Sequence, residues 1–222
     1  MADLGMDIWH VRRPLHDAAE EGSKPNGKHG GAQLGTTHSI SFAEDPKHLG
    51  FVLARYKFVA RMLQGKQNVL EVGCGDGTGA RVVGSTVYNL VLTDSLEQSH
   101  CHRHDMTLDG PFRLPAIPAW DAAYALDVME HVDERDQDEF LINICKCLHD
   151  RGICIIGMPS LESQLFASPA SKSQHINCKT EKGLREALTP HFSNVFMFGM
   201  NDETLHTGFG AMCHYRLAVC TR

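Results

Sequence analysis

Apolar and polar positions along this chain alternate with two different periods. Continuous apolar runs of strand length occur at residues 68–72, 89–93, 120–126 and 153–158. Such runs are typical of strands that are buried on both faces of a parallel sheet. Elsewhere apolar residues recur every three or four positions, which predicts helices at residues 51–63, 78–83, 136–148 and 180–188. This order of elements predicts a doubly wound α/β sheet.

The remaining segments have weaker patterns. A short strand is predicted at residues 101–104. Gly152 is predicted to end the helix at residues 136–148. Residues 159–178 have the composition of a long loop. Two further strand-like runs, at residues 195–200 and 212–220, end the pattern. In a doubly wound sheet, ligands bind beyond the carboxyl ends of the strands, so the loops there are the candidate site.

The first part of the chain is poorly patterned. Residues 20–35 are rich in Gly, Lys and Ser, which is typical of a mobile loop. We therefore expect residues 1–47 to form an extension that is either partly disordered or a flap over a substrate pocket. Residues 48–222 are expected to form the main domain.

Composition narrows the class of protein. Of the 222 residues, 42% are hydrophobic, which is ordinary for a globular core, and the net charge of −6 disfavours nucleic acid as a partner. Eight scattered cysteines without a C-x-x-C pair indicate reduced core residues. The chain begins without an apolar signal segment, and no apolar run is long enough to span a bilayer. A cytoplasmic protein with no membrane contact is expected.

A glycine-rich turn follows the first predicted strand. Residues 68–77 read N-V-L-E-V-G-C-G-D-G, which is a pattern that lets the backbone approach a nucleotide-like ligand. Gly75, Gly77 and Ala80 formally satisfy the dinucleotide fingerprint, with Asp94 in place to hold a ribose. An NAD-dependent oxidoreductase is therefore one hypothesis.

The acidic residues of this turn favour another cofactor. Asp76 would lie inside the loop that must cradle a pyrophosphate, where a carboxylate repels the ligand. S-adenosylmethionine has no phosphate, and its sulfonium, ammonium and ribose diol tolerate Glu71 and Asp76 and can use Asp94. This cofactor therefore accounts better for the turn than NAD does.

At this point the chain resembles the class I S-adenosylmethionine-dependent methyltransferases. The motifs match in the expected order: E-V-G-C-G-D-G at residues 71–77, Asp94, H-D-M at 104–106 and A-L-D-V-M-E-H-V at 125–132. The resemblance covers residues 50–222. Within the family, the motifs look like those of the branch that contains ubiquinone-type, sugar and natural-product methyltransferases. It implies a mostly parallel seven-stranded sheet with a C-terminal antiparallel hairpin.

The resemblance also implies a set of cofactor-binding residues. Glycines of the turn would line the methionine and ribose, Asp94 would hold the ribose, and Asp105 with Met106 would contact the adenine. The implied set is Glu71, Gly73, Cys74, Gly75, Asp94, Ser95, Asp105, Met106, Leu126 and Asp127. Asp127 could instead be a strand-end cap, Met106 a core residue, and Gly77 a site of helix packing.

Methyl transfer to a hydroxyl requires a base, and histidine suits neutral pH. Of fourteen histidines, three follow strands at the expected rim: His131, His175 and His206. We expect one of His175 and His206 to be the base and the other to orient the substrate, because both lie in long connections. His131 could equally pack beneath the cofactor.

No metal is expected. The predicted strand at residues 153–158 ends without a carboxylate that could hold magnesium. The cluster His100, Cys101, His102 and His104 could suggest a metal site, but alternate side chains of a strand point to opposite faces, so these ligands should not all converge.

The expected activity is metal-independent methyl transfer to a small polar acceptor, through a hydroxyl group and a histidine base. A methyltransferase that acts on RNA or protein is the alternative, beside the NAD-dependent oxidoreductase and a binding protein without turnover. The expected partner is a small molecule, and the sequence leaves a homodimer open.

Overall fold

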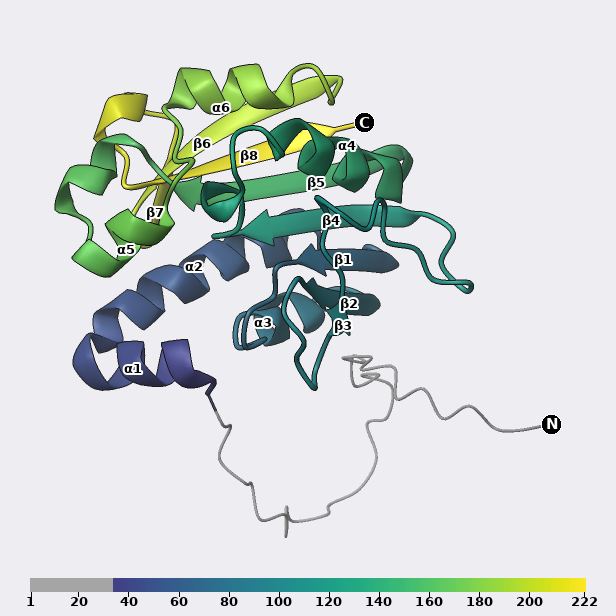
Figure 1. The fold of residues 1–222 in the computed structure, drawn as a ribbon, viewed down its shortest axis with the longest axis horizontal. Helices are drawn as coiled ribbons and strands as arrows, with labels where there is room; N and C mark the ends of the chain where they lie inside the picture. The colour runs from purple at the N-terminus through teal and green to yellow at the C-terminus, as the bar shows by residue number, and fades with distance from the viewer. Residues whose placement is uncertain (1–33) are drawn as a thin grey trace, which may run out of the picture.

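A computed structural model describes residues 34–222 (Figure 1). Of the predicted extension, residues 1–33 lie outside the described residues, whereas residues 36–44 form a helix. The helices are α1 Thr36–Glu44, α2 Pro46–Met62, α3 Ala80–Gly84, α4 Gln137–Cys147, α5 Pro169–Gln174, α6 Glu181–Leu188, and the 3-10 helices η1 Met129–His131, η2 Glu162–Phe166 and η3 Gly210–Met212. The strands are β1 Asn68–Val72, β2 Asn89–Asp94, β3 His102–Arg103, β4 Trp120–Leu126, β5 Leu148–Pro159, β6 Asn194–Asn201, β7 Thr204–His206 and β8 Tyr215–Thr221.

The strands form one sheet in the order β3-β2-β1-β4-β5-β8-β6-β7. Strands β1 to β5 pair in parallel, whereas β8 is antiparallel to both β5 and β6. This confirms the predicted fold class with its C-terminal antiparallel hairpin. The predicted count of seven strands is too low by one, because the three-residue strand β7 lies in a connection that is too short to show a periodic pattern.

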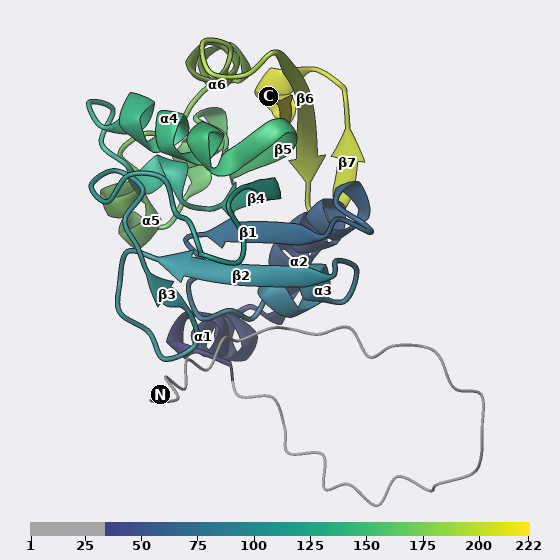
Figure 2. The ribbon, with the colours of Figure 1, turned by 90° about the vertical axis from the view of Figure 1, so that its right-hand side faces the viewer.

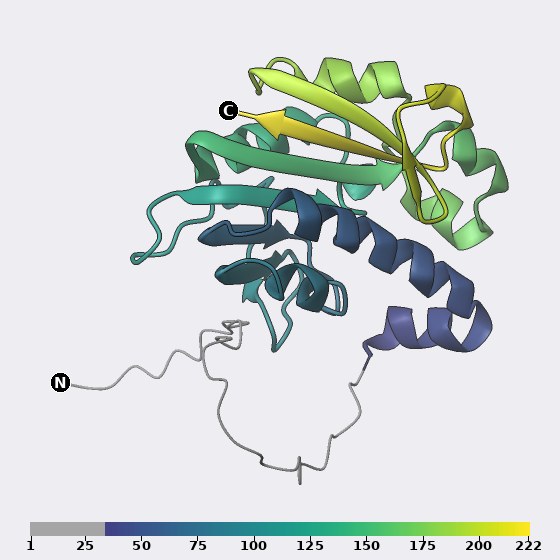
Figure 3. The same cartoon turned by 180° about the vertical axis from the view of Figure 1, so that it is seen from behind.

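Two hydrophobic clusters cover the two faces of this sheet. Alternate residues of β4 belong to different clusters: Ala123 and Ala125 face α4 and α6, whereas Tyr124 faces α2 and α3. Figure 2 and Figure 3 show the helices on opposite sides of the strands. The sheet is therefore buried on both faces, which explains why its strands read as continuous apolar runs. Within the described residues, no helix is long and apolar enough to cross a bilayer.

Strand β1 lies between β2 and β4. The chain runs from β1 to β2 and β3 on one side of the sheet, and then crosses back to β4 and β5 on the other side. A crevice opens at such a switch point, beyond the carboxyl ends of the strands. The glycine turn follows β1, and η1 follows β4. The fold therefore brings the two most distinctive motifs of the sequence to the same crevice.

Two predicted boundaries are wrong. Strand β5 begins at Leu148 and not at residue 153, so helix α4 ends at Cys147 and Gly152 lies inside the strand. Leu148 pairs with Trp120 across a register shift, and a Cβ on Gly152 would lie 2.6 Å from the Cβ of Leu148. Glycine therefore permits an irregular strand here and does not end a helix.

The predicted loop at residues 159–178 is largely helical. It contains η2 and the short helix α5, which begins with Ser168 as the N-cap and Pro169 in the first turn. The Ser168 side chain accepts a hydrogen bond from the backbone N–H of Ser171. The N-cap serine and the proline are signals that start a helix. The sequence prediction missed them because the segment has few apolar residues.

Candidate active site

The glycine turn holds an unusual backbone path between β1 and α3. Gly73 and Gly75 have φ values of +72° and +54°, which is a region that side-chain-bearing residues rarely adopt. A Cβ on Gly73 would lie 2.4 Å from a methyl group of Val128. A Cβ on Gly75 would meet no atom of residues 34–222 within 4 Å. Gly73 is thus needed for close packing, and Gly75 leaves open space for a ligand.

Asp94 fixes the shape of this turn from the end of β2. Its Oδ2 accepts a hydrogen bond of 2.9 Å from the backbone N–H of Gly75, and its Oδ1 accepts one of 2.9 Å from the N–H of Leu96. Each carboxylate oxygen has a second lone pair. Asp94 can therefore hold the turn and accept hydrogen bonds from a diol at the same time.

Glu71 lies beneath the turn and does not line the crevice. Its carboxyl group is buried and accepts a 2.7 Å hydrogen bond from the hydroxyl of Tyr124. Burial raises the pKa of Glu71 to about 8, against the opposing effect of hydrogen bonds from Tyr124 and Tyr56. Near pH 7 this group is therefore mostly neutral and supports the floor of the site.

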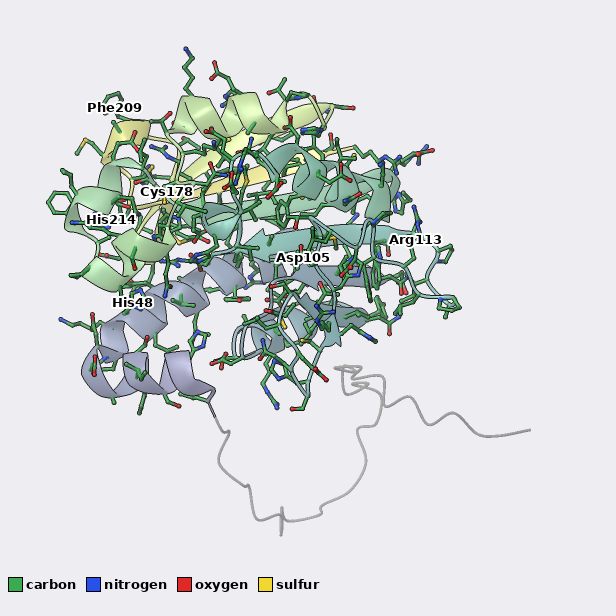
Figure 4. The ribbon with its side chains drawn as sticks, in the orientation of Figure 1. His48, Asp105, Arg113, Cys178, Phe209 and His214 are labelled. Atoms are coloured by element: carbon green, nitrogen blue, oxygen red, sulfur yellow. The ribbon has the colours of Figure 1, made fainter. Side chains whose placement is uncertain are left out.

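A first cavity, of about 280 Å³, lies between the glycine turn and the loop after β3. Its lining includes Gly73, Ser95, Asp105 and Met106, which are four of the residues expected to bind the cofactor. The Asp105 carboxylate caps its own loop by accepting hydrogen bonds from Thr107, and Figure 4 labels this residue. Met106 is buried and also lines the cavity, so it is both a core residue and a wall of the site.

A second cavity, of about 440 Å³, lies beside the first. Its walls come from α1, α2, the glycine turn, the end of β4 and α5. Cys74, Gly75, Leu126, Asp127 and His175 contribute from the expected site residues. Gly73 and His131 line both cavities, so the two spaces adjoin at these residues.

Asp127 faces the second cavity from a strained position at the end of β4. Its φ is +56°, and both carboxylate oxygens accept hydrogen bonds of 2.9 Å from Nη1 of Arg55. The Arg55 guanidinium also lies 3.9 Å above the ring of Tyr215. Burial acts to lower the pKa of Arg55, but Asp127, together with Tyr215 and Glu130, more than offsets it and the pKa is raised. The sequence did not identify Arg55, because it falls among the polar residues of an amphipathic helix.

Two of the three predicted histidines meet at the second cavity. The rings of His131 and His175 are 5.1 Å apart in an edge-to-face arrangement. Nδ1 of His131 lies 3.1 Å from the carbonyl oxygen of Gln174, and Nδ1 of His175 lies 3.0 Å from the amide oxygen of Gln164. Because these oxygens only accept, each Nδ1 carries the proton and each Nε2 keeps a lone pair.

Glu130 adds a carboxyl group to this pair of histidines. It is fully buried, and neither of its side-chain oxygens has a hydrogen-bond partner among residues 34–222. Burial, followed by repulsion from Asp127, raises the pKa of Glu130 well above its usual range. One ligand atom each from Glu130, His131 and His175 lie within 4.8 Å of one another, which is a spacing that a divalent metal ion could bridge.

His206 lies apart from this group. It is on strand β7, opposite Gly199 of β6, and its Nδ1 accepts a 3.1 Å hydrogen bond from the N–H of Gly208. It is not among the described residues that line either cavity. The structure therefore brings His131 and His175 together and places His206 at the edge of the sheet.

Comparison with known proteins adds a family match. A family model described as a methyltransferase domain matches residues 44–190. No curated protein matches the sequence significantly.

Solved structures share the fold at low sequence identity. A S-adenosylmethionine-dependent methyltransferase from Archaeoglobus fulgidus is 15% identical, with a TM-score of 0.62 over 85% of this chain and 100% of its own. The 1,6-didemethyltoxoflavin N1-methyltransferase of Burkholderia thailandensis, solved with S-adenosylhomocysteine, is 15% identical, with a TM-score of 0.59 over 87% and 93%. The small RNA methyltransferase HEN1 is 13% identical, with a TM-score of 0.58 over 76% and 25%.

Proposed function

Since the chain belongs to the methyltransferase domain family and is a class I S-adenosylmethionine-dependent methyltransferase, we propose that it methylates a hydroxyl group of a small polar acceptor. The observation that supports this acceptor chemistry is the pair His131 and His175, whose side chains line the second cavity together with the glycine turn. Family membership favours this class of enzyme over the NAD-dependent oxidoreductase.

The crevice suits a cationic cofactor without phosphate. Among the described residues that line the two cavities, Arg55 is the single Lys or Arg, and Asp127 already neutralises it. We place the adenine beside Asp105 and the ribose on Asp94, with the methionine over the open space at Gly75. When bound, S-adenosylmethionine supplies a methyl group on a positively charged sulfur, which departs as a neutral thioether.

The residues of the second cavity have two tasks in this reaction. They must hold the acceptor oxygen in line with the methyl carbon and keep water away. As the new oxygen–carbon bond forms, the hydroxyl proton passes to Nε2 of His175 or His131. Burial and the neighbouring His131 lower the pKa of His175, so its imidazole is neutral and able to accept a proton near pH 7.

The buried Glu130 favours a second version of the same reaction. The sequence led us to expect no metal, but a fully buried carboxyl group without a hydrogen-bond partner beside two imidazoles suits a divalent cation. Glu130, His131 and His175 would hold that ion, and an ion there would lower the pKa of a hydroxyl bound to it. The two versions share the acceptor class and differ in their dependence on metal.

A small acceptor is supported by the size and charge of the site. The second cavity has about 440 Å³, within the range of small-molecule sites, and the net charge of −6 does not favour RNA. A macromolecular acceptor remains the alternative, since the structural neighbours include a small RNA methyltransferase as well as a 1,6-didemethyltoxoflavin methyltransferase.

The test begins with the release of S-adenosylhomocysteine in the presence of polyhydroxylated small molecules, catechols and short RNA. With the best acceptor, His131→Ala and His175→Ala should each lower kcat by ~10²- to 10⁴-fold at saturating cofactor. His206→Ala is the matched comparison, because it changes a histidine outside both cavities. Turnover near that of the wild type in both cavity variants would overturn the proposal.

Metal removal then separates the two versions. If an ion assists, a chelator should abolish turnover, added Mg²⁺, Mn²⁺ or Zn²⁺ should restore it, and Glu130→Gln should be inactive. If a histidine acts alone, added Mg²⁺ should not change kcat, and Glu130→Gln should remain active.

A further inference from the structure

Two members of the histidine and cysteine cluster in the sequence, His100 and Cys101, lie in the segment before β3. The strand comprises only His102–Arg103, so His100 and Cys101 lie in the turn before it and are not bound by strand alternation. The glycine turn brings Cys74 to the same place. One ligand atom from each of Cys74, His100 and Cys101 lies within 4.8 Å of the other two.

We propose that Cys74, His100 and Cys101 form a binding site for a thiophilic divalent cation, with Zn²⁺ as the best fit. Tetrahedral zinc with bonds of about 2.0–2.3 Å places its ligand atoms roughly 3.5–3.8 Å apart, which small side-chain movements can reach from here. Two thiolates would neutralise the charge of the ion. Thiolate and imidazole ligands select zinc over magnesium or calcium.

The surroundings of the three side chains support this assignment. All eight cysteines are free thiols, and Sγ of Cys74 donates a hydrogen bond of 3.6 Å to the carbonyl oxygen of Gly75. Nε2 of His100 lies 2.9 Å from the carbonyl oxygen of Gly75. Since that oxygen only accepts, Nδ1 keeps the lone pair that a metal requires.

The site has a structural consequence for the crevice. Cys74 belongs to the glycine turn, whereas His100 and Cys101 lie beyond β2, whose last residue Asp94 holds that turn. A bound ion would therefore link the glycine turn to the segment before β3, and Asp94 lies between these two segments in the sequence. Gly77 is needed at this contact, because a Cβ there would lie 3.1 Å from the ring of His100.

The experiment uses the full chain, reduced with a phosphine and freed of metal, and titrates it with Co²⁺ as a spectroscopic substitute for Zn²⁺. Thiolate ligands should give a near-ultraviolet charge-transfer band that Zn²⁺ then removes by displacement. Cys101→Ser should lose the band, and His100→Ala should bind Co²⁺ at least tenfold more weakly. Equal thermal unfolding of the metal-free proteins checks that each variant is folded.

Two controls make the outcome specific. Cys145→Ser changes a half-buried cysteine of α4 and should keep the band. Cys178→Ser tests the cluster of Glu130, because this half-buried cysteine follows Asn177, whose backbone N–H donates a hydrogen bond of 3.0 Å to the carbonyl oxygen of Glu130. Absence of a band in the wild type, a band retained in Cys101→Ser, or a band lost in Cys178→Ser would each overturn the proposal. None of these outcomes depends on methyl transfer.

Discussion

The carboxyl groups of Glu71 and Asp76 differ in protonation because their surroundings differ. Glu71 is buried beside Tyr124 and has a pKa of about 8, so it is mostly neutral. Asp76 is partly buried, which acts to raise its pKa, but hydrogen bonds from His38 and Thr78 lower it overall, so it stays ionised. The two acids of the E-V-G-C-G-D-G motif therefore have different tasks: one supports the floor, and the other anchors α1.

Replacing Glu71 tests this assignment through the pH dependence of stability. The pKa is about 4.3 in an unfolded chain and about 8 in the folded protein. The folded state thus binds the extra proton between these values, and the free energy of unfolding falls as pH rises from ~4.3 to ~8. Glu71→Gln keeps the acceptor for Tyr124 and removes the titration.

In urea unfolding, Glu71→Gln should therefore lose less stability than the wild type between pH 6 and pH 9. The expected difference is on the order of a few kcal/mol. Glu97→Gln, an exposed position, should follow the wild type at both pH values. Parallel losses in the wild type and Glu71→Gln would show that Glu71 is ionised in the folded protein.

The pH dependence of turnover tests His175. Burial, and then the nearby His131, lower its pKa from the usual value of about 6.5. A base must be neutral to accept a proton, so kcat should fall as pH drops through this lowered pKa. The acid limb of a kcat profile, measured with saturating substrates, should have its midpoint below pH ~6.5. A midpoint above that value would contradict the assignment.

At the scale of elements, Arg216 of β8 holds η2, which precedes the helix α5 at the second cavity. The side chain of this arginine is almost fully buried, lies 2.7 Å from Glu162 of η2, and lies 3.9 Å from Glu181 of α6. Its Nη2 also donates to the carbonyl oxygen of Gly210. A buried guanidinium thus links η2, α6 and η3, and the sequence pattern predicts no contact among these three segments.

The two ion pairs of Arg216 should differ in strength. Glu162→Gln removes a close charge-assisted hydrogen bond to a buried cation and should lower the free energy of unfolding by ~1.5–3 kcal/mol. Glu181→Gln weakens a longer and more exposed pair, so it should cost less than about 1 kcal/mol. Urea unfolding at neutral pH measures both. Equal losses would contradict this ranking of the two contacts.

Helix α1 is the described part of the predicted extension, and it supports the flap hypothesis. Nδ1 of His38 lies 2.7 Å from the Asp76 carboxylate, and His38 lines the second cavity. His38→Ala should loosen α1 and raise the KM for the acceptor by about two- to fivefold. Glu44→Ala, at an exposed position of the same helix, is the control. An unchanged acceptor KM would argue against a flap.

At the scale of the whole molecule, the sequence predicted what depends on local pattern. Strand β4 matches residues 120–126 because its apolar run is bounded by polar loops. The contacts that complete the site could not be predicted, since each joins residues far apart along the chain. The bond from Tyr124 to Glu71 depends on the β1–β4 register, and the pair of Arg55 with Asp127 depends on how α2 lies against the sheet.

The two adjoining cavities predict how ligands should stabilise the folded protein. S-adenosylhomocysteine has no phosphate and should occupy the crevice beside Asp94, whereas the pyrophosphate of NAD would meet the ionised Asp76. At 100 times its Kd, a ligand that binds only the folded state adds about 2.7 kcal/mol. For a domain of this size, that raises Tm by roughly 5–10 °C.

A thermal-shift titration should therefore show a rise with S-adenosylhomocysteine and none with NAD. Asp94→Asn should reduce the rise, whatever its own Tm, because the amide can accept only through one atom and cannot hold both Gly75 and a ribose diol equally well. Asp150→Asn, at an exposed position, should keep the full rise. Stabilisation by NAD and not by S-adenosylhomocysteine would show that the glycine turn binds a dinucleotide, because the pyrophosphate of NAD would then bind beside Asp76 despite its charge.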